Sequence, residues 1–241
     1  MLFLIAPCAV PATTIVAVRT PQAVSISADS KAHYSGGATG NVCKIYRAGR
    51  LYFAIAGLDH DQRRGFYPAR TVAASFEESA TFSHAVEKVK QLLKGQMKAE
   101  LKSLKTNDKS EYAYAVKSGE PLSLVFAEVR DGIPYLGGFG FKVSGANSKL
   151  TDTQIVCPGD CPDGEYLLHL GASGALVERI QNYKRSGQTA SEDELTRLLV
   201  QSEIEVAPTD VGPPIVTLHL DVNGATWVSN DSGCPIVAVP E

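Results

Sequence analysis

The order of the strand-like and helix-like patterns is the feature that most constrains the fold of this chain. Strand-like apolar stretches come first, at 13–19, 23–28, 41–45 and 51–56. Apolar residues then recur at helical spacing from Thr71 to Leu104, which predicts one long helix or a pair broken near Gly95. Strands, helices, strands, helices and strands therefore follow one another in blocks.

Two hairpin signals indicate that the later strands are antiparallel. Arg130-Asp131-Gly132 separates the stretches 122–129 and 133–143, and Asn223-Gly224 separates 215–222 from 225–229. Between the hairpins, the sequence predicts a strand at 165–170 and helices at 175–185 and 192–202, with Ser191 as the N-cap of the second helix. Hairpins in place of repeated strand-helix-strand units suit two stacked antiparallel sheets between helical layers, an α+β fold.

Composition predicts one globular domain over residues 13–241. The chain has 241 residues, of which 44% are hydrophobic and 20% charged, enough for a substantial core. A net charge of −3 argues against a nucleic-acid partner, and no apolar run after the first residues approaches the roughly 20 needed to span a bilayer. The polar, lysine-rich stretch Lys102 to Ser118 is expected to be a solvated loop.

Thr13 is the candidate nucleophile. It follows a short apolar leader, residues 1–12, that ends Val10-Pro11-Ala12, and it opens the run Thr-Thr-Ile-Val-Ala-Val-Arg. Cleavage after Ala12 would give Thr13 a free α-amine beside its own hydroxyl, which is a complete nucleophile-base pair. The alternative is that Thr13 and Thr14 are β-branched residues that only begin a strand.

The residues that follow carry a family resemblance. Ala28-Asp29-Ser30, Lys44-Ile45 and Ala54-Ile55-Ala56-Gly57 come after the threonines in order. Together these segments resemble the first part of proteasome β-type and bacterial HslV-type subunits, which are N-terminal-nucleophile (Ntn) hydrolases. The resemblance is specific from Thr13 to about Asp61 and looser to about residue 230. It implies a four-layer αββα Ntn-hydrolase sandwich, and an exported bacterial member is the expected variant.

The resemblance also implies roles for single residues. Lys44 would lower the proton affinity of the Thr13 hydroxyl, and Asp29 would keep Lys44 charged and oriented. The Gly57 N–H would hold the oxyanion, and Ser173, in Gly171-Ala172-Ser173-Gly174, would help proton transfer. Ile55 and Ala32 are the expected substrate-binding residues, and the apolar Ile55 suggests an apolar side chain beside the cleaved bond.

The expected function is thus an N-terminal threonine hydrolase, a peptidase that cleaves amide bonds through an acyl-enzyme on Thr13, with no cofactor and no metal. Its partners would be a peptide or other amide substrate and further copies of the chain, in a ring or a dimer. Three sequence features depart from the family. Ala12 stands where self-processing members have glycine, and Leu58 stands where the family has a second glycine after the Ala-Gly pair. The stretch 207–214 replaces an Asp-x-x-Ser-Gly-Gly segment.

Several other functions stay open. A non-catalytic scaffold or binding subunit would share the fold, and so would an amidase or acylase. A serine hydrolase would use Ser173 with Asp210 and His219, which follow the chain order of the α/β-hydrolases. Asp59-His60-Asp61 has metal-capable residue types, but acidic residues there also suit the start of a helix.

The leader and the cysteines bear on localisation. Small residues before Thr13 and the apolar core Leu2 to Ala6 favour a signal peptide and a periplasmic or secreted protein, although the charged start is missing. The alternative is a cytoplasmic protein with autocatalytic propeptide removal. Without Cys8, four cysteines remain, and we expect disulfides Cys157–Cys161 and Cys43–Cys234 among the three pairings that sequence allows. A zinc site or free buried thiols are the competing interpretations.

Overall fold

The computed structural model describes most of the chain between Thr13 and Ser229. The described residues are 13–33, 39–59, 61, 64–117, 119–144, 149–162, 164–171, 176–187 and 190–229. The expected leader, Ser173 and Cys234 lie outside them.

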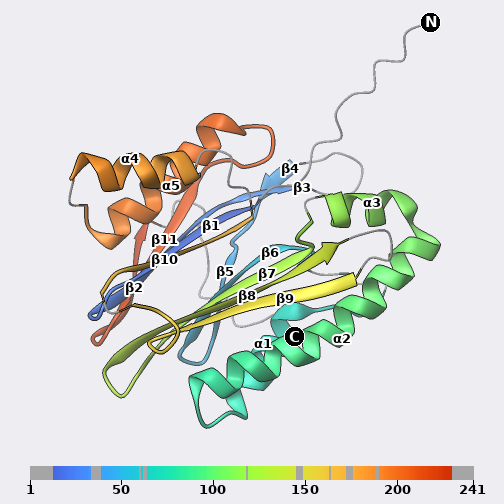
Figure 1. Cartoon of the computed structure of the whole chain (residues 1–241), viewed down its shortest axis with the longest axis horizontal. Coiled ribbons are helices and arrows are strands. Elements are labelled where there is room, and N and C mark those ends of the chain that lie inside the picture. Colours follow the sequence, from blue (N-terminus) through green and yellow to red (C-terminus); the bar gives the residue numbers. More distant parts are fainter. Residues whose placement is uncertain are drawn as a thin grey trace, which may run out of the picture.

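The first sheet has the strand order β10-β1-β2-β11-β12 (Figure 1). Its neighbouring strands are all antiparallel. The strands span β1 (Thr14–Arg19), β2 (Ala23–Asp29), β10 (Tyr166–Gly171), β11 (Ile215–Asp221) and β12 (Gly224–Ser229).

The second sheet has the order β5-β6-β7-β8-β9 and is also antiparallel throughout. Its strands span β5 (Ile45–Ala48), β6 (Leu51–Gly57), β7 (Leu122–Arg130), β8 (Ile133–Ser144) and β9 (Lys149–Cys157). A separate pair, β3 (Lys31–His33) and β4 (Thr39–Asn41), joins the two sheets along the chain.

Helices cover the outer face of each sheet (Figure 1). The first sheet carries α4 (Leu176–Ser186) and α5 (Glu192–Val206), and the second carries α1 (Pro68–Glu77) and α2 (Phe82–Asn107), with α3 (Lys109–Lys117) after them. The predicted αββα sandwich is confirmed. Ser191 caps α5 as expected, since its side chain accepts the N–H of Glu194 in a capping box.

Three apolar clusters fill the spaces between the four layers, and the alternation of side chains along the strands produces them. In β1, Ile15 and Ala17 point into the core between the sheets, whereas Val16 and Val18 pack under α4 and α5. In β6, Ala54 and Ala56 face the other sheet, while Ile55 faces the helices α1 and α2. Both strands are buried on two faces because they lie in the middle layers.

Two predictions about the helical region were wrong. The helices α1 and α2 form a pair, but the break is at 78–81 and not at Gly95, because the Thr81 side chain caps α2 by accepting the N–H of His84. Gly95 lies inside α2 with an open surface around it.

The predicted solvated loop Lys102 to Ser118 is largely helical, since α2 continues to Asn107 and α3 follows. Leu104 and Ala115 are buried against the second sheet's helical layer, whereas Lys102, Lys105 and Lys109 are exposed. These lysines lie on the solvent face of amphipathic helices. The prediction of a loop was wrong because it rested on the polar composition of the segment alone.

Candidate active site at the start of β1

Asp29 organises the site. It ends β2, and the antiparallel register that pairs Ile15 with Ala28 brings it opposite the start of β1. Its side chain is fully buried. One carboxylate oxygen, Oδ1, accepts the Thr14 N–H at 2.9 Å and the Lys44 ammonium at 2.8 Å. The other, Oδ2, accepts the N–H groups of Lys31 at 3.1 Å and Gly212 at 3.3 Å. A buried carboxylate needs such donors to remain charged.

Lys44 lies in the segment between β4 and β5 and is only 7% exposed. Burial lowers the pKa of its ammonium below the usual value of 10.5, and the charges of Asp29 and Asp59 with the hydrogen bond to Asp29 offset part of that effect. The ammonium shares Asp29 Oδ1 with the N–H of Thr14. It therefore lies beside the peptide that joins Thr13 to Thr14.

Thr13 and Thr14 differ in exposure. Thr14 is fully buried within β1, whereas Thr13, just before the strand, is half-buried. A substrate can reach a partly exposed side chain far more readily than a fully buried one. This difference favours Thr13 over Thr14 as the reactive residue.

The ends of three strands meet at Thr13. Gly171, the last residue of β10, has φ +82°, and a Cβ built on it would overlap the carbonyl oxygen of Thr13 and lie 3.7 Å from the Ala56 Cβ. Ala56 immediately precedes Gly57 at the end of β6. The start of β1 and the ends of β6 and β10 are thus brought together from different sheets.

Gly57 has a backbone that requires glycine. Its φ is +94°, and a Cβ would overlap the carbonyl oxygen of Pro121. That oxygen accepts the N–H of Leu58 at 2.8 Å, which fixes the turn after β6. The glycine is therefore needed for the backbone geometry, and its expected role as oxyanion donor stays a prediction.

The two expected substrate-binding residues occupy different environments. Ala32 is half-buried in β3, opposite Gly40. Ile55 is buried in the apolar cluster between the second sheet and its helices. Their contact with a substrate stays a prediction, as does the role of Ser173.

Sequence reasoning missed the contribution of the segment 207–214. Gly212 donates its N–H to Asp29 and accepts the Ser30 N–H at 3.2 Å. The Lys31 ammonium donates to the carbonyl oxygens of Pro208 at 2.7 Å and Thr209 at 2.6 Å. The segment lacks the expected Ser-Gly-Gly motif, yet its backbone supports Asp29. Only the Gly212 and proline content of the segment signalled a fixed turn.

The serine-hydrolase alternative requires His219 to pair with Asp210. His219 Nδ1 lies 3.0 Å from Asp193 Oδ1, an aspartate in the first turn of α5, and so it pairs with a residue other than the required Asp210.

The expected disulfide Cys157–Cys161 is present, which excludes zinc and free thiols for these two residues. Cys43 is also disulfide-bonded, and its expected partner Cys234 lies outside the described residues. Structural disulfides are typical of oxidising compartments.

Within the described ranges, no group of three or more His, Cys, Asp or Glu residues is placed to hold a metal ion. His60 of the Asp59-His60-Asp61 candidate lies outside those ranges. Of the helices in the described part of the chain, none is long and apolar enough to cross a membrane.

Replacing Gly171 with alanine tests how closely β10 supports Thr13. We expect Gly171→Ala to displace Thr13 and to lower both stability and any activity that depends on Thr13, because the new Cβ meets a backbone oxygen. Gly132→Ala is the matched control, since Gly132 has a similar φ of +76° but nothing within 4 Å. Thermal unfolding and activity assays should show the larger loss for Gly171→Ala, whereas equal losses would mean that only backbone strain matters.

Comparison with known proteins supports the fold alone. No family model and no curated protein matches the chain. Among solved structures, the fold is similar to that of Anbu from Hyphomicrobium sp. strain MC1, with a TM-score of 0.53, 13% sequence identity, and coverage of 90% of this chain and 88% of that chain.

The assignment to the proteasome β-type and HslV-type subunits, as an exported bacterial member of that family, is therefore wrong: no such family model matches, and a solved structure with a similar fold is Anbu, at 13% identity. The matching segments are short and lie at strand ends. There the fold itself requires residues such as Asp29, which holds the start of β1, and Gly57, at positive φ. The expected ring or dimer stays a prediction.

Proposed function

We propose that this protein is a hydrolase of peptide or other amide bonds that uses Thr13 as an N-terminal nucleophile. The observation that carries the proposal is the buried ion pair between Lys44 and Asp29. The carboxylate oxygen that binds Lys44, Asp29 Oδ1, also accepts the N–H of Thr14. A buried ion pair is costly to maintain because both charges lose their contact with water. This pair lies beside Thr13, which is half-buried, whereas Thr14 next to it is fully buried. Perturbed ionisable groups of this kind are concentrated at functional sites.

The proposed reaction proceeds in two steps. The Thr13 Oγ attacks the carbonyl carbon while its proton passes to the free α-amine of Thr13, and the Gly57 N–H binds the oxyanion that forms. The C–N bond then breaks, the leaving amine takes the proton, and an ester to Thr13 remains. Water attacks this ester with the α-amine again as base, which releases the carboxylic acid and restores the hydroxyl.

Lys44 and Asp29 serve this reaction electrostatically. The Lys44 ammonium stabilises negative charge that develops near Thr13, and Asp29 holds the ammonium in place. Asp29 also fixes the start of β1 through Thr14, so one side chain positions both the charge and the backbone of the nucleophile. The backbone N–H groups of Gly212 and Lys31 support Asp29 through its other carboxylate oxygen, Oδ2.

The proposal includes removal of residues 1–12, because Thr13 has no free α-amine before that. We further propose that a signal peptidase removes them and that the protein works outside the cytoplasm. The Cys157–Cys161 disulfide and the bonded Cys43 support this location.

N-terminal sequencing and intact mass of the protein, purified from a host that exports it, test the maturation step. We expect a chain that begins at Thr13. Production in a reducing cytoplasm is the control, where the leader should remain. An exported, soluble chain that still begins at Met1 would contradict the proposal.

The pH dependence tests the role of Lys44. The active form needs a neutral α-amine and a charged Lys44. Activity should therefore rise as the α-amine loses its proton, at about pH 8 for an unperturbed group, and fall as Lys44 loses its own. Because burial lowers the pKa of Lys44, the fall should begin below the usual 10.5.

Lys44→Arg is the matched variant for this profile. Arginine keeps its charge throughout the accessible pH range, so the alkaline fall should disappear, although a larger side chain in a buried site should also reduce the maximum rate. Circular dichroism at each pH tests whether the fall in activity comes from unfolding of the protein. An alkaline limb that is identical in the variant would assign it to another group.

A further inference from the structure

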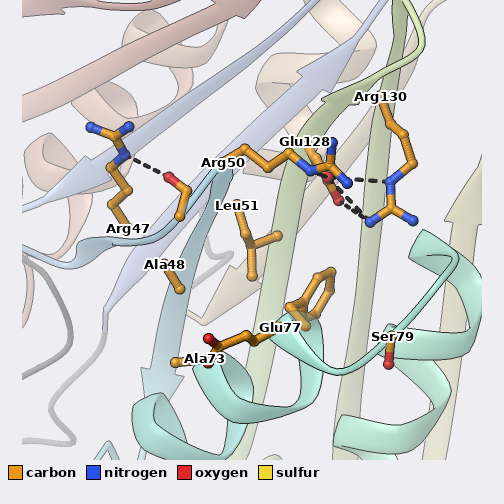
Figure 2. Close-up of a pocket in the computed structure, with 11 residues that line it drawn as sticks. Arg47, Ala48, Arg50, Leu51, Ala73, Glu77, Ser79, Glu128 and Arg130 are labelled. Carbon is orange, nitrogen blue, oxygen red and sulfur yellow. Dashed lines mark hydrogen bonds and ion pairs between the residues drawn. The ribbon is translucent and has the colours of Figure 1, made fainter.

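A cavity lies at the start of β6, the strand that Gly57 ends. Figure 2 shows the residues that line it. The cavity has a volume of about 620 Å³ and is bounded by the β5–β6 turn, by α1 and by β7. Leu51, the first residue of β6, lines it, and Gly57 ends the same strand. At about 3.3 Å per residue, the cavity is roughly 20 Å from the proposed active site.

One wall of the cavity is a fixed ionic cluster. Glu128 of β7 is only 1% exposed and accepts hydrogen bonds from Arg130 Nε and Nη2 at 3.1 to 3.3 Å. Arg130 also donates Nη1 to the carbonyl oxygen of Ala80 at 2.6 Å. All three nitrogens of its guanidinium are therefore engaged. The charges of Glu128 and Arg130 offset each other, so this pair serves as a rigid support.

Two further arginines line the cavity: Arg47, which donates Nε to the Gly49 carbonyl oxygen at 2.7 Å, and Arg50. Arg50 is the one that lies beside the ionic cluster. It pairs with Glu128 through Nε, and its side chain is 67% exposed. Among the described residues, Arg50 has no partner other than Glu128. Since Arg130 already offsets Glu128, the charge of Arg50 remains available for a ligand carboxylate, which a guanidinium binds with two parallel hydrogen bonds.

Glu77 supplies the opposite charge. It belongs to α1, is exposed, and has no partner among the described residues. In Figure 2, Arg50 and Glu77 lie on opposite sides of Leu51. Leu51 and Phe76 are buried residues that give the cavity an apolar floor, and Ala48 and Ala73 leave space above it.

A simple anion would meet the charge of Glu77, and a simple cation would meet that of Arg50. A molecule with a carboxylate, an ammonium group and apolar side chains satisfies both charges and the floor together. The cavity volume lies within the range of about 300 to 1,000 Å³ that is typical of small-molecule sites. We propose that this cavity binds a short zwitterionic peptide with apolar side chains, through Arg50 and Glu77.

Calorimetric titration with the dipeptide Leu-Leu tests the proposal. The protein used is the chain beginning at residue 13 with Thr13→Ala, so that cleavage at the proposed active site does not complicate the titration. We expect Leu-Leu to bind, and N-acetyl-Leu-Leu and Leu-Leu-amide each to bind about tenfold or more weakly, because each lacks one charged hydrogen-bonding group.

Variants locate the site. Arg50→Gln and Glu77→Gln should each weaken Leu-Leu binding about ten- to hundredfold. Ala73→Leu should abolish it by filling the cavity from the half-buried face of α1. Arg185→Gln, at an exposed arginine of α4, is the control and should bind as the parent does.

Three results would overturn the proposal. One is no detectable binding of Leu-Leu. Another is binding that the Arg50, Glu77 and Ala73 variants leave unchanged, which would place the dipeptide elsewhere, including at the Thr13 site. The last is equal binding of N-acetyl-Leu-Leu and Leu-Leu, which would make the cavity an anion site with no role for Glu77.

Discussion

Thr13→Ala should lose activity against amide substrates by a factor on the order of 10⁴ or more. The substitution removes the proposed attacking oxygen, and loss of the nucleophile in another hydrolase costs about 10⁶ in turnover. The α-amine would remain, but an amine alone provides no hydroxyl to form the ester. A panel of fluorogenic peptide amides, with apolar, acidic and basic residues before the cleaved bond, measures the loss.

Thr13→Ser and Thr14→Ala are the informative companions. Serine keeps a hydroxyl beside the α-amine and should retain measurable activity. Thr14→Ala removes a buried side chain at the next position, so it should reduce stability without abolishing turnover. If Thr13→Ala cleaved the panel as fast as the parent, the chain would be a scaffold or a binding subunit, or a hydrolase with another nucleophile.

Asp29→Asn should give the largest loss of stability among single substitutions at the site, about 3 to 5 kcal/mol. The change leaves the Lys44 ammonium buried without its counter-charge, and breaking a buried pair from one side costs about this much. It also places an amide NH₂ group, a donor, among the N–H groups of Thr14, Lys31 and Gly212. Urea unfolding at pH 7 measures the difference.

Glu78→Gln is the matched control, because Glu78 pairs with Lys88 on the surface and should be replaced with little change in the urea midpoint. The double variant Asp29→Asn with Lys44→Met removes both charges and should recover part of the lost stability. An Asp29→Asn protein as stable as the parent would show that the ion pair does not hold the start of β1.

The fold was largely predictable because its signals are local. Continuous apolar runs at 13–19 and 51–56 predict strands, and helical spacing from Phe82 to Leu101 predicts a helix. The turns at Asp131-Gly132 and Asn223-Gly224 predict hairpins, and each of these signals can be read without knowledge of the rest of the chain. The prediction of secondary structure failed where the burial of side chains decides it. The lysines at 102, 105 and 109 indicated a loop, and only contact with the rest of the protein shows that Leu104 and Ala115 make the segment helical.

The site was partly predictable for a similar reason. Asp29 is the last residue of an apolar strand, and a charged side chain that is buried there needs hydrogen-bond donors or a counter-charge. Lys44 came from the resemblance in short motifs, and the structure does pair it with Asp29. The support from Gly212 and Lys31 depends on backbone groups of the segment 208–212, which is about 180 positions away from Asp29 and Lys31 in the sequence. Every residue has such backbone groups, so the sequence does not show which of them form hydrogen bonds. The family assignment failed because the same short motifs are what the fold requires at these strand ends.

Covalent labelling of the mature chain is the most direct test of Thr13 as nucleophile. The protein beginning at residue 13 would be incubated with a β-lactone, whose strained ester acylates an activated hydroxyl, and then digested for tandem mass spectrometry. We predict one acyl adduct, as an ester on the Thr13 side chain, that forms much more slowly in Lys44→Met and is absent in Thr13→Ala. An adduct that lies on another residue, or that forms equally fast in Thr13→Ala, would contradict the proposed mechanism.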